Sequence, residues 1–252
     1  MAGDPGNIRQ EKIRRYIESR DVVTIHELEE LCPEVSVMTI HRDLDALERA
    51  REISKFRGGA RSIRRMNDPI FDIRVRENNA EKTIVAEKAL ALIRQNSSVF
   101  LDASTTNLAL ARRLPDMSLS IITTSPTIAL ALCHLSSPHI TLCCGTLHRQ
   151  NLTLSGQNTL DMLSAINIDL ALVGVSGCSA EAGFTCGTED DMRVKKTVIE
   201  KARTSVILCD HSKFKRLMPY TFCAIDRPDI LICDTAPPEK IVDAMRGRVK
   251  IL

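Results

Sequence analysis

The stretch Ser36-Val37-Met38-Thr39-Ile40-His41-Arg42-Asp43-Leu44 predicts the fold of the first part of the chain. Ser36 is a good helix cap, because its hydroxyl can accept a hydrogen bond from a backbone N–H of the first turn. Ile40 and Leu44, continued by Leu47, recur at helical spacing and form one apolar stripe. The stretch therefore predicts an amphipathic helix whose N-terminal positions are free to meet a partner.

Two further helices and a hairpin surround this helix in the sequence. Residues 8–18 place apolar side chains at roughly helical spacing, and the capping-box pattern Thr24–Glu27 predicts the start of a second helix. Over residues 53–63, apolar residues alternate around Gly58-Gly59, which predicts a two-stranded hairpin closed by a glycine turn. Two helices, a turn, a third helix and a hairpin are the layout of a winged helix-turn-helix domain, expected over residues 1–66.

The charges of this part are unevenly distributed. Residues 1–50 hold seven Lys/Arg against eleven Asp/Glu, whereas residues 51–66 hold six Lys/Arg against one Glu. A basic stretch after an acidic helical region suggests a surface that meets a polyanion, although a solvated basic linker would carry the same charges.

Nine residues are the candidate contacts to double-stranded DNA. In a helix-turn-helix domain the second helix of the motif enters the major groove, where Arg can bind guanine and Thr can contact a thymine methyl group. Arginines of the hairpin would contact phosphate or the minor groove. An ordinary three-helix bundle with a basic edge is the alternative interpretation. The candidates are Ser36, Val37, Met38, Thr39, His41 and Arg42 on the helix, and Arg57, Arg61 and Arg64 on or near the hairpin.

A polar stretch, residues 67–80, is expected to be a linker, and residues 81–252 then alternate between helix and strand. Such alternation predicts an α/β domain with a mainly parallel sheet covered on both faces, in which ligands bind at the carboxyl ends of the strands. The expected strands are 98–102, 120–124, 140–144, 170–175, 205–210 and 229–234. The expected helices are 81–95, 106–114, 127–135, 159–166, 191–202 and 238–246.

Two strand ends carry groups that could bind an anion. Asp102-Ala103-Ser104-Thr105-Thr106 follows a strand and opens a helix, where free backbone N–H groups and hydroxyls can hold a phosphate. A plain helix cap explains the same residues. Asp210-His211-Ser212-Lys213-Phe214 follows a later strand, and its lysine can hold a phosphate or a sugar hydroxyl as a charged donor.

The cysteines and the apolar runs exclude several classes of protein. The nine cysteines form no C-x-x-C pattern and have no His or Cys partners at ligand spacing, so we expect free thiols and no metal. Cys32, Cys178 and Cys186 lie in less apolar surroundings than the other six. Because the apolar runs are too short to span a membrane and the first residues lack the apolar core of a signal peptide, we expect a cytoplasmic protein.

The segment Val35–Glu48, followed by Gly58-Gly59-Ala60, resembles the DeoR family of bacterial transcriptional regulators. That family typically has V-S-x-x-T-I-R-R-D-L-x-x-L-E and then G-G-A. His41 replaces the first arginine of the pair and removes a permanent charge. The turn through Cys32-Pro33-Glu34 is one residue longer than the family's.

The resemblance continues through the second domain and implies a fold similar to ribose-5-phosphate isomerase. The family's D-x-G-T-T matches residues 102–106, with Ser104 in place of glycine, and its D-H-S-K-F matches residues 210–214. The family also carries a lysine at the position of Lys195, and weaker matches cover three further strand ends. The resemblance implies an effector site of Asp102, Ser104, Thr105, Thr106, Thr124, Gly145, Gly174, Lys195, Asp210 and Lys213.

The resemblance implies a DNA-binding repressor of a carbohydrate-catabolic operon, released when a phosphorylated sugar binds, and not an enzyme. We expect no cofactor, and a homodimer or homotetramer, because helix-turn-helix proteins pair across operator half-sites. One alternative is an isomerase-like enzyme with Asp102, Asp191 or Asp210 as its base. Another is a constitutive DNA binder whose α/β domain serves only oligomerisation.

Overall fold

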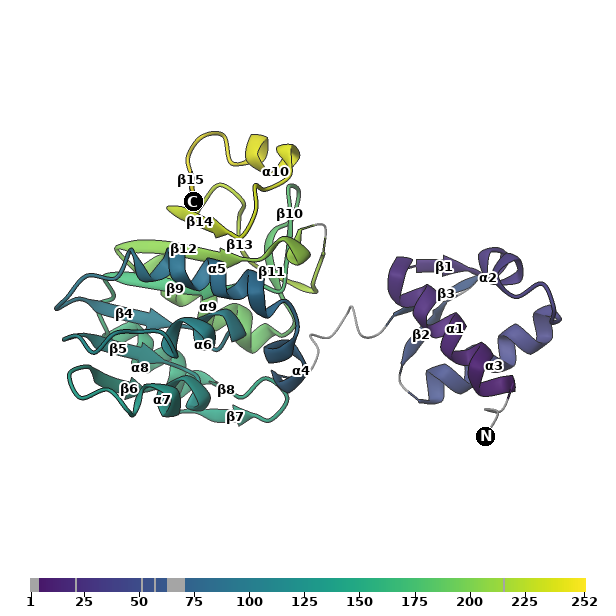
Figure 1. Cartoon of the computed structure of the whole chain (residues 1–252), viewed down its shortest axis with the longest axis horizontal. Helices are drawn as coiled ribbons and strands as arrows, with labels where there is room; N and C mark the ends of the chain where they lie inside the picture. Colours follow the sequence, from purple (N-terminus) through teal and green to yellow (C-terminus); the bar gives the residue numbers. More distant parts are fainter. Residues whose placement is uncertain (1–4, 21, 51, 57, 63–70, 215) are drawn as a thin grey trace. The chain divides into compact units, whose positions relative to one another are not determined.

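The computed structural model of the chain describes residues 5–20, 22–50, 52–56, 58–62, 71–214 and 216–252 (Figure 1). The chain divides into two compact units, Met1–Asp68 and Pro69–Leu252, each described separately below.

The first unit packs three helices against a three-stranded antiparallel sheet of order β1-β3-β2. The expected helices and hairpin are confirmed, including the capping box of Thr24 with Glu27 and the cap formed by Ser36. The additional strand β1 was not predicted. The elements are α1 (Pro5–Arg20), β1 (Val22–Thr24), α2 (Ile25–Leu31), α3 (Val37–Arg49), β2 (Ile53–Phe56) and β3 (Gly59–Ser62).

The close approach of β1 explains why residue 59 of the hairpin is glycine. A Cβ atom at Gly59 would lie 2.2 Å from the carbonyl oxygen of Val23 on β1, so a larger residue would push the two strands apart. The apolar stripe of α3 is buried against this sheet and the other helices, as predicted. The unit therefore has its own small core.

The second unit is built on a seven-stranded sheet of order β15-β14-β12-β9-β4-β5-β6 in which all described pairs are parallel. The parallel α/β fold is confirmed. The strands are β4 (Ser98–Leu101), β5 (Ser120–Thr123), β6 (His139–Leu142), β9 (Leu170–Gly174), β12 (Thr204–Cys209), β14 (Ile230–Cys233) and β15 (Lys250–Ile251).

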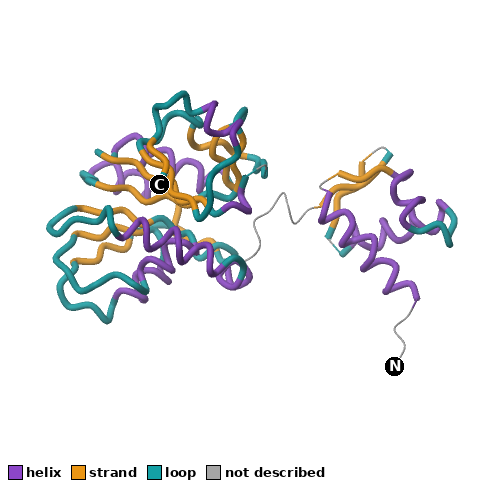
Figure 2. Tube along the Cα trace, turned by 45° about the horizontal axis from the view of Figure 1, so that its top comes forward, coloured by secondary structure: helices purple, strands orange, loops and turns teal. Residues whose placement is uncertain are grey.

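Helices cover both faces of this sheet, as Figure 2 shows. Apolar residues of α5, α6 and α7 pack on one face, and those of α8, α9 and α10 pack on the other. The helices are α4 (Phe71–Arg76), α5 (Asn79–Leu90), α6 (Thr105–Ala111), α7 (Pro126–Leu132), α8 (Gln157–Ala165), α9 (Glu189–Lys201) and α10 (Glu239–Ala244).

Two smaller antiparallel sheets, which were not predicted, complete the unit. A hairpin of β7 and β8 follows β6, and a three-stranded sheet has the order β10-β11-β13. These strands are β7 (Thr146–His148), β8 (Thr153–Ser155), β10 (Gly177–Ser179), β11 (Gly183–Cys186) and β13 (Tyr220–Cys223).

The expected linker, residues 67–80, contains the helix α4 and the first residues of α5. Phe71 is buried, and Val75 packs against the same core cluster as α6. The polar composition of this stretch thus concealed a short amphipathic helix. None of the helices in the described ranges is long and apolar enough to cross a membrane.

The order of the strands creates a crevice in the middle of the sheet. From β4 the chain proceeds outward to β5 and β6, and from β9 it proceeds in the opposite direction to β12, β14 and β15. The chain therefore leaves β4 and β9 in opposite directions. Parallel α/β sheets bind ligands in the crevice between two such strand ends.

Candidate functional site

The start of α3 presents the candidate DNA-reading residues. Met38 and Val37 are 65% and 41% exposed, and Arg42 is also exposed. Thr39 and His41 are half-buried, and the backbone N–H of Thr39 donates to the hydroxyl of the helix cap Ser36. This face is free to meet the edges of bases, because the apolar stripe on the opposite side holds the helix in the core.

A buried carboxylate, missed in the sequence, anchors α3 to α1. Asp43 is 3% exposed, and its two oxygens accept hydrogen bonds from Arg9 Nε at 2.5 Å and Arg9 Nη2 at 3.2 Å. Gln10 Nε2 adds a bond of 3.0 Å. These contacts fix the rotation of α3 about its axis, which determines the side chains that it exposes.

The hairpin arginines are only partly covered by the described residues. Arg57 and Arg64 lie outside them, and for Arg61 the structure describes the backbone, which pairs with Val22 and Ser54. On the neighbouring strand, Lys55 forms an ion pair with Asp45 of α3. The hairpin and α3 are thus joined by a charge pair.

At the crevice of the second unit, Asp102 and Lys195 form a buried ion pair. The carboxylate follows β4, the ammonium group comes from α9, and the two are in direct contact. Lys195 Nζ also donates to the carbonyl oxygen of Gly174 at 2.9 Å and lies 3.5 Å from Asp191 Oδ1. The predicted residues Asp102, Gly174 and Lys195 therefore meet at one point.

The pair perturbs the protonation of both groups. Burial alone would raise the pKa of Asp102, but the charge and the hydrogen bond of Lys195 outweigh it and hold that pKa below its usual value. Burial would lower the pKa of Lys195, but Asp102 and Asp191 raise it. A lowered pKa is the opposite of what a general base working near neutral pH needs.

The ends of β4 and β9 approach closely because residue 174 is glycine. A Cβ atom there would lie 2.4 Å from the Cβ of Ser104, the residue that caps α6. A helix cap was the alternative interpretation of these residues, and the hydroxyl of Ser104 accepts from the backbone N–H of Asn107 at 3.1 Å. Thr105 and Thr106 follow as buried first residues of α6.

Asn107 belongs to this cluster although it was not predicted. Its side chain is fully buried, and Nδ2 donates to Asp102 Oδ1 at 2.6 Å and to the carbonyl oxygen of Leu172 at 2.8 Å. A polar residue inside the apolar run of α6 was the available signal, since a buried amide requires partners.

A second cluster, Asp210 to Lys213, lies at the end of β12, the neighbour of β9. Asp210 is 2% exposed; its Oδ1 accepts from the Ser212 backbone and hydroxyl, and its Oδ2 lies 3.8 Å from Lys213 Nζ. His211 Nδ1 lies 2.6 Å from Asp234 Oδ2, which raises the pKa of the imidazole. Of the two lysines predicted for the effector site, Lys195 is in direct contact with Asp102, whereas Lys213 lies 3.8 Å from Asp210.

Thr124 and Gly145 make mainly packing contacts. The carbonyl oxygen of Thr124 accepts from the backbone N–H of Leu154 at 2.7 Å. Gly145 lies against Ser155 and Thr159. Both predicted residues therefore contact β8 and its surroundings and support the rim of the sheet.

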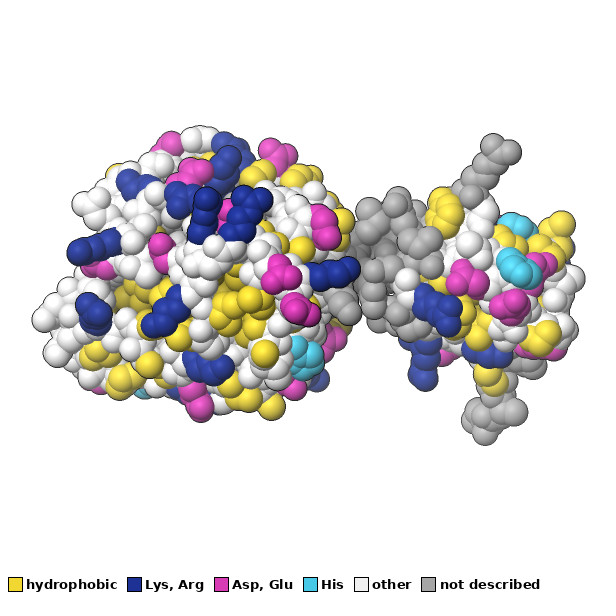
Figure 3. Space-filling view, turned by 90° about the horizontal axis from the view of Figure 1, so that it is seen from above, with side chains coloured by type: hydrophobic (Ala, Val, Ile, Leu, Met, Phe, Trp, Pro, Cys, Tyr) yellow, Lys and Arg dark blue, Asp and Glu magenta, His cyan; other side chains and the backbone are white. Residues whose placement is uncertain are grey.

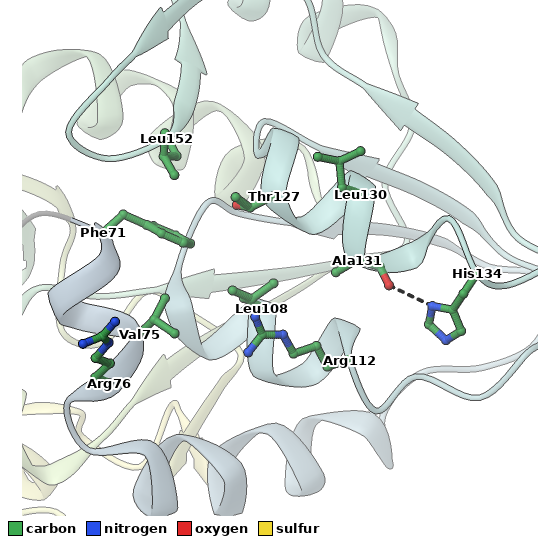
Figure 4. Close-up of a pocket in the computed structure, with 10 residues that line it drawn as sticks. All are labelled: Phe71, Val75, Arg76, Leu108, Arg112, Thr127, Leu130, Ala131, His134 and Leu152. Carbon is green, nitrogen blue, oxygen red and sulfur yellow. Dashed lines mark hydrogen bonds between the residues drawn. The ribbon is translucent and has the colours of Figure 1, made fainter.

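A groove of about 690 Å³, shown in Figure 4, lies on the side of this unit that carries α4, α6 and α7. None of Asp102, Lys195 and Asp210 lines it. Its walls come from α4, α6, α7 and the β7–β8 loop. The lining residues are Phe71, Val75, Arg76, Leu108, Arg112, Thr127, Leu130, Ala131, His134 and Leu152.

The face of the second unit that Figure 3 shows carries side chains of both charges. In the view of Figure 3, Lys and Arg side chains of the second unit lie among acidic and hydrophobic ones. Within the described residues, no group of three or more His, Cys, Asp or Glu side chains is placed to hold a metal ion.

Comparison with known families assigns both units. Residues 9–66 match the DeoR-like helix-turn-helix domain, and residues 77–235 match the DeoR C terminal sensor domain.

Two curated relatives match over most of their length. The chain is 33% identical to the HTH-type transcriptional repressor GlcR of Bacillus subtilis, over 89% of this chain and 88% of the relative. It is 30% identical to the glycerol-3-phosphate regulon repressor of Escherichia coli, over 84% of each. Among solved structures, ribose 5-phosphate isomerase A of Methanocaldococcus jannaschii is 19% identical over 56% of each chain, with a TM-score of 0.41.

Proposed function

This chain belongs to the DeoR family of transcriptional regulators, and from that premise we propose that it represses a carbohydrate-catabolic operon until a phosphorylated sugar binds its sensor domain. Members of the family act by binding DNA and not by catalysis. The repressor role is supported by the names of two relatives, GlcR and the glycerol-3-phosphate regulon repressor. The second name also indicates that a small phosphorylated polyol is the class of effector to test first.

The observation that carries the proposal is the set of charged side chains at one edge of the parallel sheet. Asp102 and Lys195 lie at the crevice, and Asp210 and Lys213 follow the adjacent strand β12. Carboxylates accept hydrogen bonds from sugar hydroxyls, and a lysine ammonium donates to phosphate oxygens. Such a set suits a ligand that carries both hydroxyls and a phosphate.

The two clusters would have different roles. Lys195 is already neutralised by Asp102, so this pair holds the crevice in shape and offers little net charge. Lys213 is 3.8 Å from Asp210 and has donor capacity left for a ligand, since an ammonium group has three protons. We therefore propose Lys213 as the cation that binds the phosphate, with Asp210 orienting it. Ser104, Thr105, Thr106, Thr124, Gly145 and Gly174 would shape the rest of the pocket.

On the DNA side, α3 would read the major groove of an operator. Arg42 would contact base edges, and the neighbouring Ser36, Val37, Met38, Thr39 and His41 would complete the contact. Arg57, Arg61 and Arg64 would bind the backbone or the minor groove. Because helix-turn-helix domains read two half-sites, we propose that the regulator acts in the cytoplasm as a homodimer or homotetramer.

A thermal-shift titration of the full chain tests the proposed effector class. Glycerol 3-phosphate, glucose 6-phosphate and fructose 1-phosphate are compared with the same compounds without phosphate and with inorganic phosphate. A ligand of the native state stabilises it by about 2.7 kcal/mol at a hundred times its Kd, so one phosphate ester should raise the melting temperature with dose. If the protein binds operator DNA but no phosphate ester shifts its melting, a constitutive DNA binder is the better account.

A further inference from the structure

A buried lysine holds the end of α4, the first helix of the sensor unit. Lys82 lies in the first turn of α5 and is 3% exposed. Its Nζ donates to the carbonyl oxygen of Glu77 at 2.6 Å and also contacts that of Arg74. The last carbonyl groups of a helix have no partner within the helix, and a cation there satisfies them and complements the helix dipole. Lys82 thus acts as a side-chain cap for α4.

The same lysine lies beside the Asp210–Lys213 cluster. Burial, and next the positive charge of Lys213, lower the pKa of Lys82 to about 8, while the charge of Asp210 acts in the opposite direction. A separate contact joins the same two regions, because Asn78 Nδ2 donates to the hydroxyl of Ser212 at 2.9 Å. Two contacts therefore connect the turn before α5 with the loop after β12.

Asp210, 3.8 Å from Lys213, only partly offsets the repulsion between the two lysines. A phosphate dianion held by Lys213 would offset the rest of this repulsion. The hydrogen bonds of the Lys82 ammonium group to the carbonyl oxygens of Glu77 and Arg74 would then strengthen. Occupation of the loop would thereby tighten α4, the helix that follows residues 63–70 and so stands directly after the DNA-binding unit in the chain.

We propose that Lys82 is a positioning residue that transmits the binding of a phosphate ester at Asp210–Lys213 to α4, and through α4 to the DNA-binding unit. This inference rests on the proposed function, because it needs a phosphorylated effector at that loop. Lys82 does not serve as the principal ligand, since its ammonium group is already engaged by Glu77 and Arg74. Its loss should uncouple effector binding from DNA release and leave both binding events in place.

The test compares Lys82→Met with Lys88→Met in the full chain. Lys88 is a matched control, because it lies on the same helix and also donates to a carbonyl oxygen, that of Cys233, at 2.7 Å. Glycerol 3-phosphate, glucose 6-phosphate and fructose 1-phosphate are titrated twice: into free protein, to measure affinity by calorimetry, and into the operator complex, to measure release by fluorescence anisotropy. The ratio of effector affinities without and with DNA is the coupling between the sites.

For Lys82→Met we expect effector affinity within about threefold of the parent but a coupling ratio reduced by about fivefold or more, toward one. Lys88→Met should keep the parent ratio. Asn78→Ala removes the contact to Ser212, although it also places alanine at a left-handed φ of 50°; it should reduce the ratio as well and serves if Lys82→Met does not fold. A change in folding stability alone would leave the ratio unchanged.

Hydrogen exchange gives a second readout. Effector should slow the exchange of amides in residues 71–78 of the parent and of Lys88→Met, but not of Lys82→Met. If Lys82→Met and Asn78→Ala release DNA with the parent's coupling ratio, the inference is wrong and the proposed function stands. If the parent binds none of the three phosphate esters, the proposed function fails and the inference fails with it.

Discussion

Asn107 Nδ2 donates a 2.6 Å hydrogen bond to Oδ1 of Asp102, and both side chains are buried at the point where the strand order of the sheet reverses. The same nitrogen donates to the carbonyl oxygen of Leu172 on β9. Asn107 therefore joins the two strands whose ends form the crevice and orients the carboxylate that pairs with Lys195.

Asn107→Ala should destabilise the sensor unit by about 1–3 kcal/mol, because it removes two buried hydrogen bonds and leaves each acceptor with a single longer bond of 3.2 Å from a backbone N–H. The exposed Asn158→Ala on α8 is the control and should stay within about 0.5 kcal/mol of the parent. Urea unfolding of the full chain, followed by circular dichroism, measures both. Equal midpoints for the two variants would mean that the contact does not support the crevice.

The ion pair of Asp102 with Lys195 predicts how stability depends on pH. Because the pKa of Asp102 is lowered in the folded state, its contribution is present above the unfolded-state value of about 3.8 and is lost as the pH falls through the lower folded value. Because the pKa of Lys195 is raised in the folded state, its contribution to stability is complete up to about pH 10 and is lost only at higher pH. The pair should therefore stabilise the fold evenly between about pH 5 and 10.

Asp102→Asn checks this prediction. The variant leaves the buried ammonium group with only Asp191, 3.5 Å away, as its counter-charge and should lose up to about 3–5 kcal/mol near neutral pH. It should also lose less stability than the parent when the pH is lowered from about 5 to 2, because the titrating group is gone. Urea unfolding across this range provides the comparison, and parallel acid profiles would contradict the assignment.

Arg42→Ala tests the recognition surface. The exposed arginine near the start of α3 should contribute about 1–3 kcal/mol to operator binding, and its loss should relax the preference at one base pair. Arg49→Ala is the matched control at the other end of the helix, where Arg49 Nε donates to the backbone of Asp45. Mobility-shift titrations at fixed salt compare the two. Equal affinity of Arg42→Ala and the parent would mean that another surface reads the DNA.

The cysteines give a prediction on reactivity. Seven of the nine are buried, and Cys133 and Cys144 are exposed. Burial also raises the pKa of Cys32, which lowers its reactive thiolate fraction. Mild alkylation of the native protein should add two groups and leave operator binding intact, as measured by mass spectrometry and a mobility shift. A rapid loss of binding, with modification of Cys32, would indicate a redox switch in the helix-turn-helix turn.

Local chemistry explains why much of the fold could be predicted. The caps at Thr24 and Ser36 and the apolar runs of β4, β9 and β12 depend on neighbours in the sequence, and the structure has them where they were expected. Short elements such as β13 and α4 escaped prediction, because they are stabilised by contacts with distant segments.

Only the site residues that belong to recognisable sequence motifs could be predicted. Lys82 and Asn107 gain part of their roles from segments far away in the sequence. The polar Asn107 within an apolar helix indicates that a buried partner exists, but it does not indicate which residue that partner is. The environments of several cysteines were misjudged for the same reason. Cys133 and Cys144 lie in apolar segments but are exposed. Cys178 and Cys186 lie on strands of the small sheet β10-β11-β13 and are buried in the same core cluster as α8 and α9.

The central claim is that a phosphorylated effector bound through Lys213 releases the regulator from DNA. Operator release is followed by fluorescence anisotropy while phosphate esters are titrated into complexes of the parent, Lys213→Ala and the control Lys240→Ala, whose exposed lysine lies on α10. A ligand can shift the protein off DNA only through its different affinities for the two states. Lys213→Ala should bind the operator like the parent and remain bound at every effector concentration, whereas Lys240→Ala should be released like the parent. Release of Lys213→Ala at the parent's midpoint would contradict the account.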